Sequence, residues 1–148
     1  MIDLMIADIA AHPKVFFLRG GALDASIPAE ICGVRPPDDL VAFWQRFGGG
    51  ELFESETILL PTIRATASLN VMDGDDVESV TAFQRAARPN LRGAVFHTGS
   101  WTSTFLTGNI FLVFNESDEL IGSFDDLDSW YAALPRKEFA ESYGVAKI

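Results

Sequence analysis

The sequence of 148 residues has little that could stabilise a fold covalently or through metal, because it contains one cysteine, Cys32, and two histidines. A single cysteine excludes an internal disulfide framework, and no spacing of Cys and His resembles a zinc site. With 48% apolar residues the chain can bury a sizeable core of its own. We therefore predict one domain, residues 1–148, that needs no metal and no cofactor.

Long apolar runs are also missing. No stretch approaches the ~18 apolar residues of a membrane-spanning helix. The first residues, MIDLMIADIAAHPK, have neither the basic start nor the long apolar core of a secretion signal. Together with the unpaired cysteine, this pattern predicts a cytoplasmic protein without a membrane partner.

Basic residues are scarce: 11 Lys and Arg stand against 21 Asp and Glu, a formal net charge of -10. Nucleic acid is a poor partner for such a chain, because phosphate binding needs a basic surface. A basic protein partner is favoured, since opposite charges accelerate the encounter. Acidity that serves solubility alone remains an open explanation.

The clearest local pattern is the segment 36–53, PPDDLVAFWQRFGGGELF. Its two prolines and two aspartates are typical of a helix N-terminus, and its three glycines allow the chain to reverse. Between them, apolar residues recur at spacings of three and four: Leu40, Phe43, Trp44 and Phe47. We predict a helix with this face buried, followed by a strand at Leu52 and Phe53.

The rest of the chain alternates between helical and strand patterns. Helical patterns cover 2–11, a short turn at 26–32, 75–87 and 127–134, with a last short helix starting at Pro135; strand patterns cover 14–18, 56–60, 93–97, 109–114 and 120–123. The last two strands pair across the turn Asn115–Glu119, which requires an antiparallel arrangement. We predict an α+β fold, with a single twisted, mostly antiparallel sheet and helices packed on it. In the helix 75–87 the expected buried face is Val77, Val80, Phe83 and Ala87.

An acidic cluster at the start of the helix 75–87 is the first candidate for a partner-facing patch. It consists of Asp73, Asp75, Asp76 and Glu78. The cluster lacks the alternation of a calcium-binding EF-hand loop, so no metal site is expected. Carboxylates that stabilise a helix N-terminus are the simpler explanation.

Three further candidates lie later in the chain. Trp101 has polar neighbours on both sides, which is typical of an exposed aromatic that anchors a binding interface. Glu116 and Asp118 lie in the predicted turn before the last strand, where acidic residues are often only solvated. The remaining cluster, Asp125, Asp126 and Asp128, is most simply a helix cap.

Catalysis is not expected. His97, Ser100 and a nearby aspartate could be arranged as a triad, but no nucleophile elbow surrounds the serine. His97 lies at the end of a predicted strand, where a hydrogen-bonded structural histidine is common. Trp44 and Trp130 lie within apolar helix faces and are expected in the core.

The order of these motifs resembles the SUKH superfamily, the Smi/Knr-like domains. The matching residues fall in three groups: Pro37, Asp38, Asp39, Leu40, Phe43, Phe47, Gly48 and Gly49; then Pro89, Gly93, Val95, Phe96, Gly99, Gly108, Phe111 and Phe114; then Ser123, Phe124, Asp125, Asp126 and Leu127, followed by Trp130 and Leu134. In place of the family's short Gly-Gly turn between the late strands, this chain has residues 100–107, which we expect to form a longer turn.

The resemblance implies a mixed α and β domain with one twisted sheet, no cofactor and no catalysis. Bacterial members of the family are thought to be immunity proteins that bind and neutralise a toxin, often a nuclease, whereas fungal members act in cell-wall regulation. Two functions stay open on this basis. One is neutralisation of a basic toxin, and the other is a regulatory or adaptor module that binds another protein.

Overall fold

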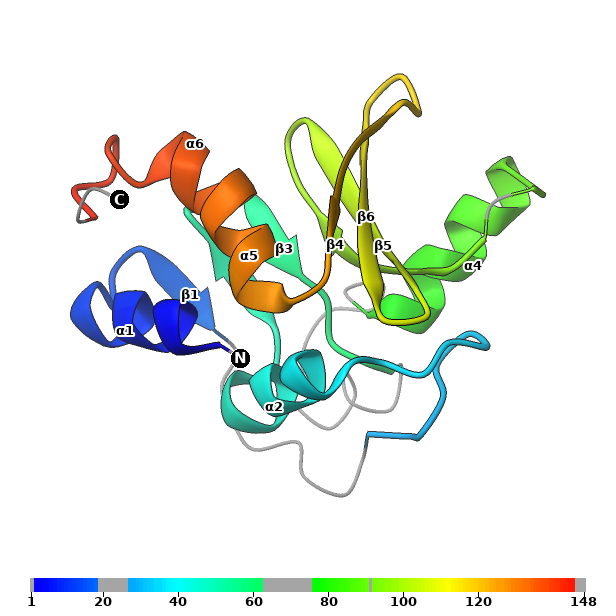
Figure 1. Cartoon of the computed structure of the whole chain (residues 1–148), viewed down its shortest axis with the longest axis horizontal. Helices are drawn as coiled ribbons and strands as arrows, with labels where there is room; N and C mark the ends of the chain where they lie inside the picture. Colours follow the sequence, from blue (N-terminus) through cyan, green and yellow to red (C-terminus); the bar gives the residue numbers. More distant parts are fainter. Residues whose placement is uncertain (1, 19–26, 63–75, 91, 146–148) are drawn as a thin grey trace.

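The computed structural model describes residues 2–18, 27–62, 76–90 and 92–145. Within them the chain forms an α+β fold around one seven-stranded sheet, as predicted (Figure 1). The strands follow one another in the sheet in sequence order, and every neighbouring pair is antiparallel: β1 Phe16–Leu18, β2 Gly50–Leu52, β3 Glu56–Ile58, β4 Ala94–Thr98, β5 Thr102–Thr107, β6 Ile110–Asn115 and β7 Leu120–Phe124.

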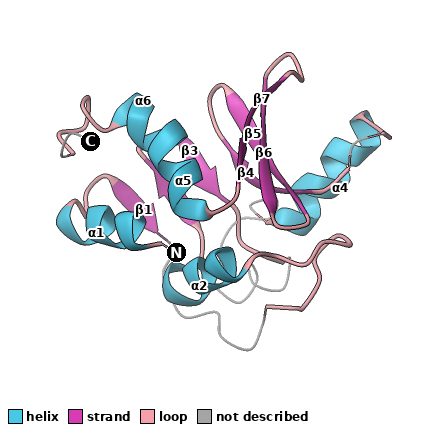
Figure 2. Ribbon diagram, in the orientation of Figure 1, coloured by secondary structure: helices cyan, strands magenta, loops and turns pink. Residues whose placement is uncertain are grey.

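Helices lie on both sides of this sheet (Figure 2). They are α1 Asp3–Ala11, α2 Asp38–Phe47, α4 Val77–Ala87, α5 Leu127–Tyr131, the π-helical turn Ala132–Arg136 and α6 Lys137–Phe139. Figure 1 shows α1 and α5 on one side of strands β4 to β7 and α4 on the other. None of the helices in the described part of the chain is long and apolar enough to cross a membrane.

Helix α2 forms where the sequence predicts it. Phe43 and Trp44 are fully buried, and the Trp44 indole nitrogen donates a hydrogen bond of 2.9 Å to the carbonyl of Leu59. Gly48 follows with a positive φ of 75°, a conformation that glycine adopts without strain. Phe47, expected on the buried face, is only half-buried, because it lies at the last turn of the helix.

Strand β5 corrects the expectation of a long turn at 100–107. The family resemblance placed a turn between the late strands here, yet β5 pairs on both sides, with β4 and with β6. Thr104 is fully buried because its hydroxyl is hydrogen-bonded inside the protein, and Phe105 and Leu106 fill the core beside it. A β-branched threonine suits a strand once its hydroxyl has a partner.

Two of the helix predictions, the turn at 26–32 and the helix starting at Pro135, are wrong. Residues 27–32 form no helical turn; instead Ile31 and Val34 form an isolated β-bridge. Pro135 does not begin a helix but lies inside the continuous segment from α5 to α6, within the π-helical turn. The wider π turn accommodates a proline, whose ring clashes with a carbonyl of the preceding α-turn.

Helix α4 is rotated relative to the prediction. Val77 and Thr81 face the sheet, whereas Phe83 is 74% exposed and Ala87 is also exposed. The Thr81 hydroxyl accepts a hydrogen bond of 2.9 Å from the backbone nitrogen of Val95 in β4. This polar contact turns the threonine side of the helix inward, so Val77 and Val80 of the predicted face pack against the core whereas Phe83 and Ala87 lie outside it.

Aspartates cap the helices, partly across the fold. Asp126 accepts a hydrogen bond from the nitrogen of Ser129 and caps α5, as expected for this acidic cluster. Asp128 accepts from the nitrogens of Leu4 and Met5, so α5 provides the cap of α1. These contacts fix α1 and α5 on the same side of the sheet.

Candidate functional site

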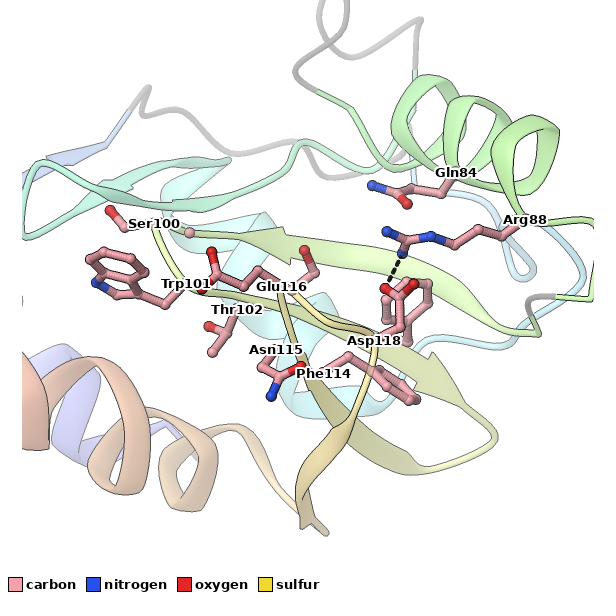
Figure 3. Close-up of a pocket in the computed structure, with 12 residues that line it drawn as sticks. Gln84, Arg88, Ser100, Trp101, Thr102, Phe114, Asn115, Glu116 and Asp118 are labelled. Atoms are coloured by element: carbon pink, nitrogen blue, oxygen red, sulfur yellow. Dashed lines mark ion pairs between the residues drawn. The ribbon is translucent and has the colours of Figure 1, made fainter.

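Three of the residues singled out in the sequence meet at one pocket. Trp101, Glu116 and Asp118 line a depression of about 110 Å³ between the β4–β5 turn, the β6–β7 turn and the C-terminal part of α4 (Figure 3). Gln84 and Arg88 of α4 form one wall, and Phe114 of β6 contributes an apolar surface. We refer to this site as the Trp101 pocket. The sequence held no signal that α4 would reach it.

The β6–β7 turn that carries two of these carboxylates is built around Asn115. Its side-chain oxygen accepts hydrogen bonds from the backbone nitrogens of Ser117 and Glu119, at 2.9 and 3.0 Å. Asp118 adopts a positive φ of 64°, which aspartate tolerates better than most residues. The predicted turn is therefore present and holds Glu116 and Asp118 in defined positions.

An ion pair closes the far end of the pocket. Arg88 Nη1 lies 2.8 Å from Asp118 Oδ1, and both side chains are partly exposed. Figure 3 shows this pair at one end of the pocket and Trp101 at the other. The site thus combines an aromatic ring, carboxylates and a single guanidinium among the residues that line it.

Trp101 is 58% exposed and lies in the turn between β4 and β5. The turn is closed by a hydrogen bond of 2.8 Å from the nitrogen of Gly99 to the carbonyl of Thr102. A second hydrogen bond, of 3.2 Å, runs from the nitrogen of Ser100 to the side chain of Glu56 in β3. A buried carboxylate therefore positions the turn that presents Trp101.

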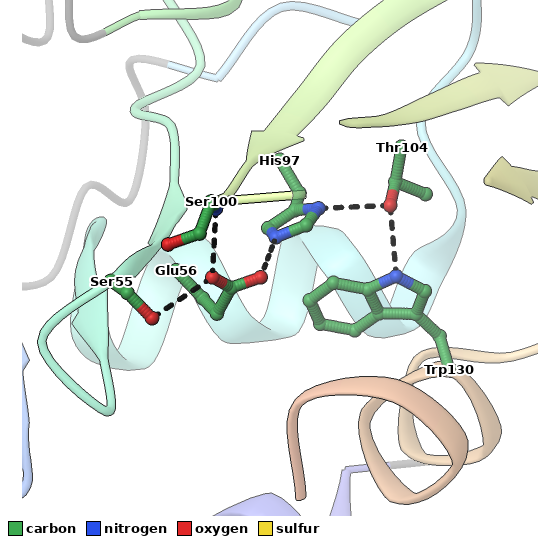
Figure 4. A network of polar contacts seen from close by, with 6 residues as sticks. All are labelled: Ser55, Glu56, His97, Ser100, Thr104 and Trp130. Atoms are coloured by element: carbon green, nitrogen blue, oxygen red, sulfur yellow. Dashed lines mark hydrogen bonds and ion pairs between the residues drawn. The ribbon is translucent and has the colours of Figure 1, made fainter. Parts of the chain in front are cut away.

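Glu56 belongs to a buried polar network with His97, Thr104 and Trp130 (Figure 4). Trp130 Nε1 donates to the Thr104 hydroxyl at 2.9 Å, and that hydroxyl lies 2.9 Å from His97 Nδ1. His97 Nε2 lies 3.1 Å from Glu56 Oε1. Since an indole nitrogen only donates and a carboxylate only accepts, the Thr104 hydroxyl accepts from Trp130 and His97 Nε2 donates to Glu56.

A β-bulge brings His97 into this network. The β4–β5 register shifts between Val95 and His97, so that Phe96 and His97 both contact the Trp130 ring, at centroid distances of 5.1 and 4.9 Å. In a regular strand two successive side chains point to opposite faces. The bulge was not evident in the sequence.

The environment of Glu56 lowers its pKa. Burial opposes this by disfavouring the charged form, but hydrogen bonding to His97 and the interaction with its ring, together with donors from Ser100 and Ser55, favour the carboxylate more strongly. Glu56 thus remains an acceptor for the turn that carries Trp101.

The polar network does not form an accessible catalytic triad. Both ring nitrogens of His97 are hydrogen-bonded, to Thr104 and to Glu56, and His97 and Thr104 are fully buried. Ser100 contributes its backbone nitrogen to Glu56. The expectation that His97 is hydrogen-bonded inside the fold is confirmed. Trp44 and Trp130 are fully buried, also as expected.

The acidic cluster before α4 is only partly within the described residues. Asp73 and Asp75 lie outside them. Asp76 is fully buried and caps α4 through a hydrogen bond of 2.8 Å from the nitrogen of Ser79, so it cannot take part in an exposed patch as proposed from the sequence. Glu78 is half-buried in the first turn of α4 and does not line the Trp101 pocket.

No cluster of three or more His, Cys, Asp or Glu residues that could hold a metal ion occurs in the described part of the chain. Comparison of the sequence with models of known families gives no match, and neither curated proteins nor solved structures give one.

Proposed function

We propose that this chain is a non-catalytic protein-binding domain that neutralises a toxin with a basic contact surface, and that it acts as an immunity protein in the cytoplasm. The observation that supports this most directly is Trp101, a tryptophan 58% exposed that lines one pocket together with Glu116 and Asp118. Single exposed aromatics are ordinary, but an aromatic held by a backbone turn next to carboxylates has the composition of an interface anchor.

The charge of the chain favours a basic partner. With a formal net charge of -10, the protein attracts a basic surface over distances of about 10 Å at moderate salt. A toxin that cleaves nucleic acid needs a basic surface where it meets phosphate. An acidic protein that covers this surface blocks the substrate without any chemistry of its own, which fits a basic nuclease as the target.

The resemblance to the SUKH superfamily supports toxin neutralisation in particular. Helix α2 carries the first group of matching residues, and the segment from β7 into α5 carries the last. Each motif is short, and the resemblance rests on the order in which the three groups follow one another along the chain. A regulatory or adaptor module with a different protein partner has the same physical requirements, so the identity of the partner decides between the two functions.

The decisive experiment uses the protein encoded next to this chain in its genome. Purified chain is titrated onto that protein at low and moderate ionic strength, and the toxicity of the neighbour is measured in cells with and without the chain. We expect tight binding, faster association at low salt and rescue of growth. Absence of binding would refute the immunity function, and binding to a non-toxic neighbour would favour the adaptor.

A further inference from the structure

The exposed apolar side chains of this protein gather on one half of the molecule. Among the described residues, large apolar side chains are exposed at six positions: Phe17, Phe83, Trp101, Ile110, Leu120 and Ile121. Only Phe17 is at the β1 edge of the sheet; the other five belong to α4, the β4–β5 turn and strands β6 and β7. Such clustering marks an interaction surface more reliably than single exposed residues do.

Strand β6 shows how this surface is built. Ile110, Leu112 and Phe114 alternate along it and share one face of the sheet, and Leu120 of β7 pairs directly with Phe114. The Phe114 ring contacts that of Phe105, at 5.3 Å between centroids, which places this face on the side of the Trp101 pocket. We call Ile110, Leu112, Phe114 and Leu120 the β6–β7 face.

Helix α4 borders the β6–β7 face through Gln84, which lines the Trp101 pocket together with Phe114. Val80, Phe83, Gln84 and Ala87 are spaced as neighbours on one side of a helix. Phe83 and Ala87, which the sequence placed in the core, are therefore exposed on the helix that borders the pocket. The core uses only Val77 and Val80 of the predicted face and leaves its other two apolar side chains uncovered.

Carboxylates lie at both ends of the β6–β7 face. Glu116, Asp118 and Glu119 stand at the turn end, with Arg88 the cation near them. At the other end, Asp125 follows β7 and lines a groove of about 490 Å³ together with Asp38, Asp39 and Asp126, with Arg35 as the cation. Both ends are thus negative on balance.

We propose that the β6–β7 face and the adjoining side of α4 bind a basic amphipathic helix of the partner protein. This inference rests on the proposed function and specifies the partner's contact segment. The β6–β7 face extends along β6 from Ile110 to Phe114, a length of about 14 Å, with Leu120 beside Phe114. This length matches about nine residues of helix. Apolar residues of that helix cover the face, and Lys or Arg at its two ends meet the carboxylates.

Two other occupants fit the structure less well. A second copy of this chain would bring carboxylates against carboxylates in either orientation, because both ends of the face are acidic. An added strand would pair with the outer edge of β7, but the β6–β7 register shifts there and leaves Ile121 as the extra residue of a bulge. A bulge interrupts the regular ladder that strand addition requires.

The test uses synthetic peptides of about 16 residues with leucine at positions i, i+3, i+4 and i+7. One peptide has Lys at both ends, a second has Glu there, and a third has a central proline that prevents a helix. Binding to the isotope-labelled chain is followed by NMR. We expect the Lys peptide to shift amides of β6, β7 and α4, with an affinity at least about tenfold above that of the other two peptides.

Protein variants locate the site. Leu120→Lys should reduce the affinity for the Lys peptide about tenfold or more, whereas Phe17→Lys, an equal change on a residue 69% exposed at the opposite edge, should leave it unchanged. Shifts away from β6–β7, equal effects of the two variants, or equal binding of the proline peptide would overturn the proposal. Dimerisation that Leu120→Lys abolishes would overturn it in favour of a second copy.

The same variants separate this proposal from the function it rests on. If the neighbouring protein binds and Leu120→Lys has no effect, the helix site is wrong and toxin binding stands. If the Lys peptide binds at β6–β7 but the neighbouring protein does not bind, the proposed function fails and the site remains.

Discussion

Arg88 and Asp118 join α4 to the β6–β7 turn across the Trp101 pocket, with 2.8 Å between Nη1 and Oδ1. The pair is partly exposed, and such pairs contribute about 0–1 kcal/mol to stability. Its value for function lies in the opposite charges of the two partners. Neutralising each in turn separates an electrostatic role from a structural one.

For a basic partner, Asp118→Asn should slow association and Arg88→Gln should accelerate it, because the first change removes attraction and the second removes repulsion. Both effects should diminish at high salt, and the melting temperatures should stay close to that of the wild type. Association rates measured at two ionic strengths check this. A decrease of the rate for both variants would show that the ion pair acts by holding the pocket together.

Trp101→Ala should accelerate dissociation from the partner, with a loss of about 2 kcal/mol or more in binding free energy, because a desolvated aromatic anchor is lost. The fold should not change, since the side chain is largely exposed. Phe17→Ala is the matched control, because Phe17 is also an exposed aromatic but lies at the other edge of the sheet. Equal dissociation rates for the two variants would place the interface elsewhere.

Thr104→Val tests the buried network. Valine keeps the shape of threonine but removes the hydroxyl that accepts from Trp130 and lies against His97 Nδ1. Each buried polar atom left without a partner costs about 1–3 kcal/mol, so urea unfolding should show a clear loss of stability. Thr107→Val, half-buried at the end of the same strand, should change the free energy of unfolding by no more than about 0.5 kcal/mol.

The lowered pKa of Glu56 predicts that the protein loses stability in acid. Its pKa is lower in the folded protein than the ordinary value of about 4.3, so its contribution is complete above that pH and is lost as the pH falls through the lower, folded value. The difference in unfolding free energy between the wild type and Glu56→Gln should therefore shrink below about pH 4. A difference that grows with acidity would contradict the lowered pKa.

Phe43→Ala and Phe47→Ala should differ in cost, although both residues lie on the same face of α2. Phe43 is fully buried, so its truncation should cost about 3–5 kcal/mol. Phe47 is only half-buried, and its truncation should cost clearly less, contrary to the value that the sequence pattern implies for a core residue. Unfolding in urea distinguishes the two; equal losses would contradict the difference in burial.

Local signals were sufficient for α2 and for the β6–β7 hairpin. In α2 the prolines and glycines set the backbone conformation within a few residues of each helix end. In the hairpin, Asn115 bonds to backbone groups two and four residues ahead. Such interactions form in the segment itself, and for that reason they can be recognised without the rest of the fold.

Strand β5 and the orientation of α4 depended on distant partners. Thr104 is satisfied by Trp130, and Thr81 accepts from Val95, so each polar side chain could be buried only because another element supplied its partner. A pattern based on hydrophobicity assigns threonine to a loop or an exposed helix side. The same limit explains why the apolar stripe with Phe83 was assigned to the core.

The sequence by itself determined the α+β class, most element positions and the individual candidates Trp101, Glu116 and Asp118. Only the tertiary structure brought these three into one pocket and placed Arg88 beside Asp118 there. It also showed that Asp76 is a buried cap of α4 and not part of an exposed patch. The reason is physical: helix ends and turns are decided by neighbouring backbone groups, whereas a pocket depends on strand register and on hydrogen bonds between residues far apart in the chain.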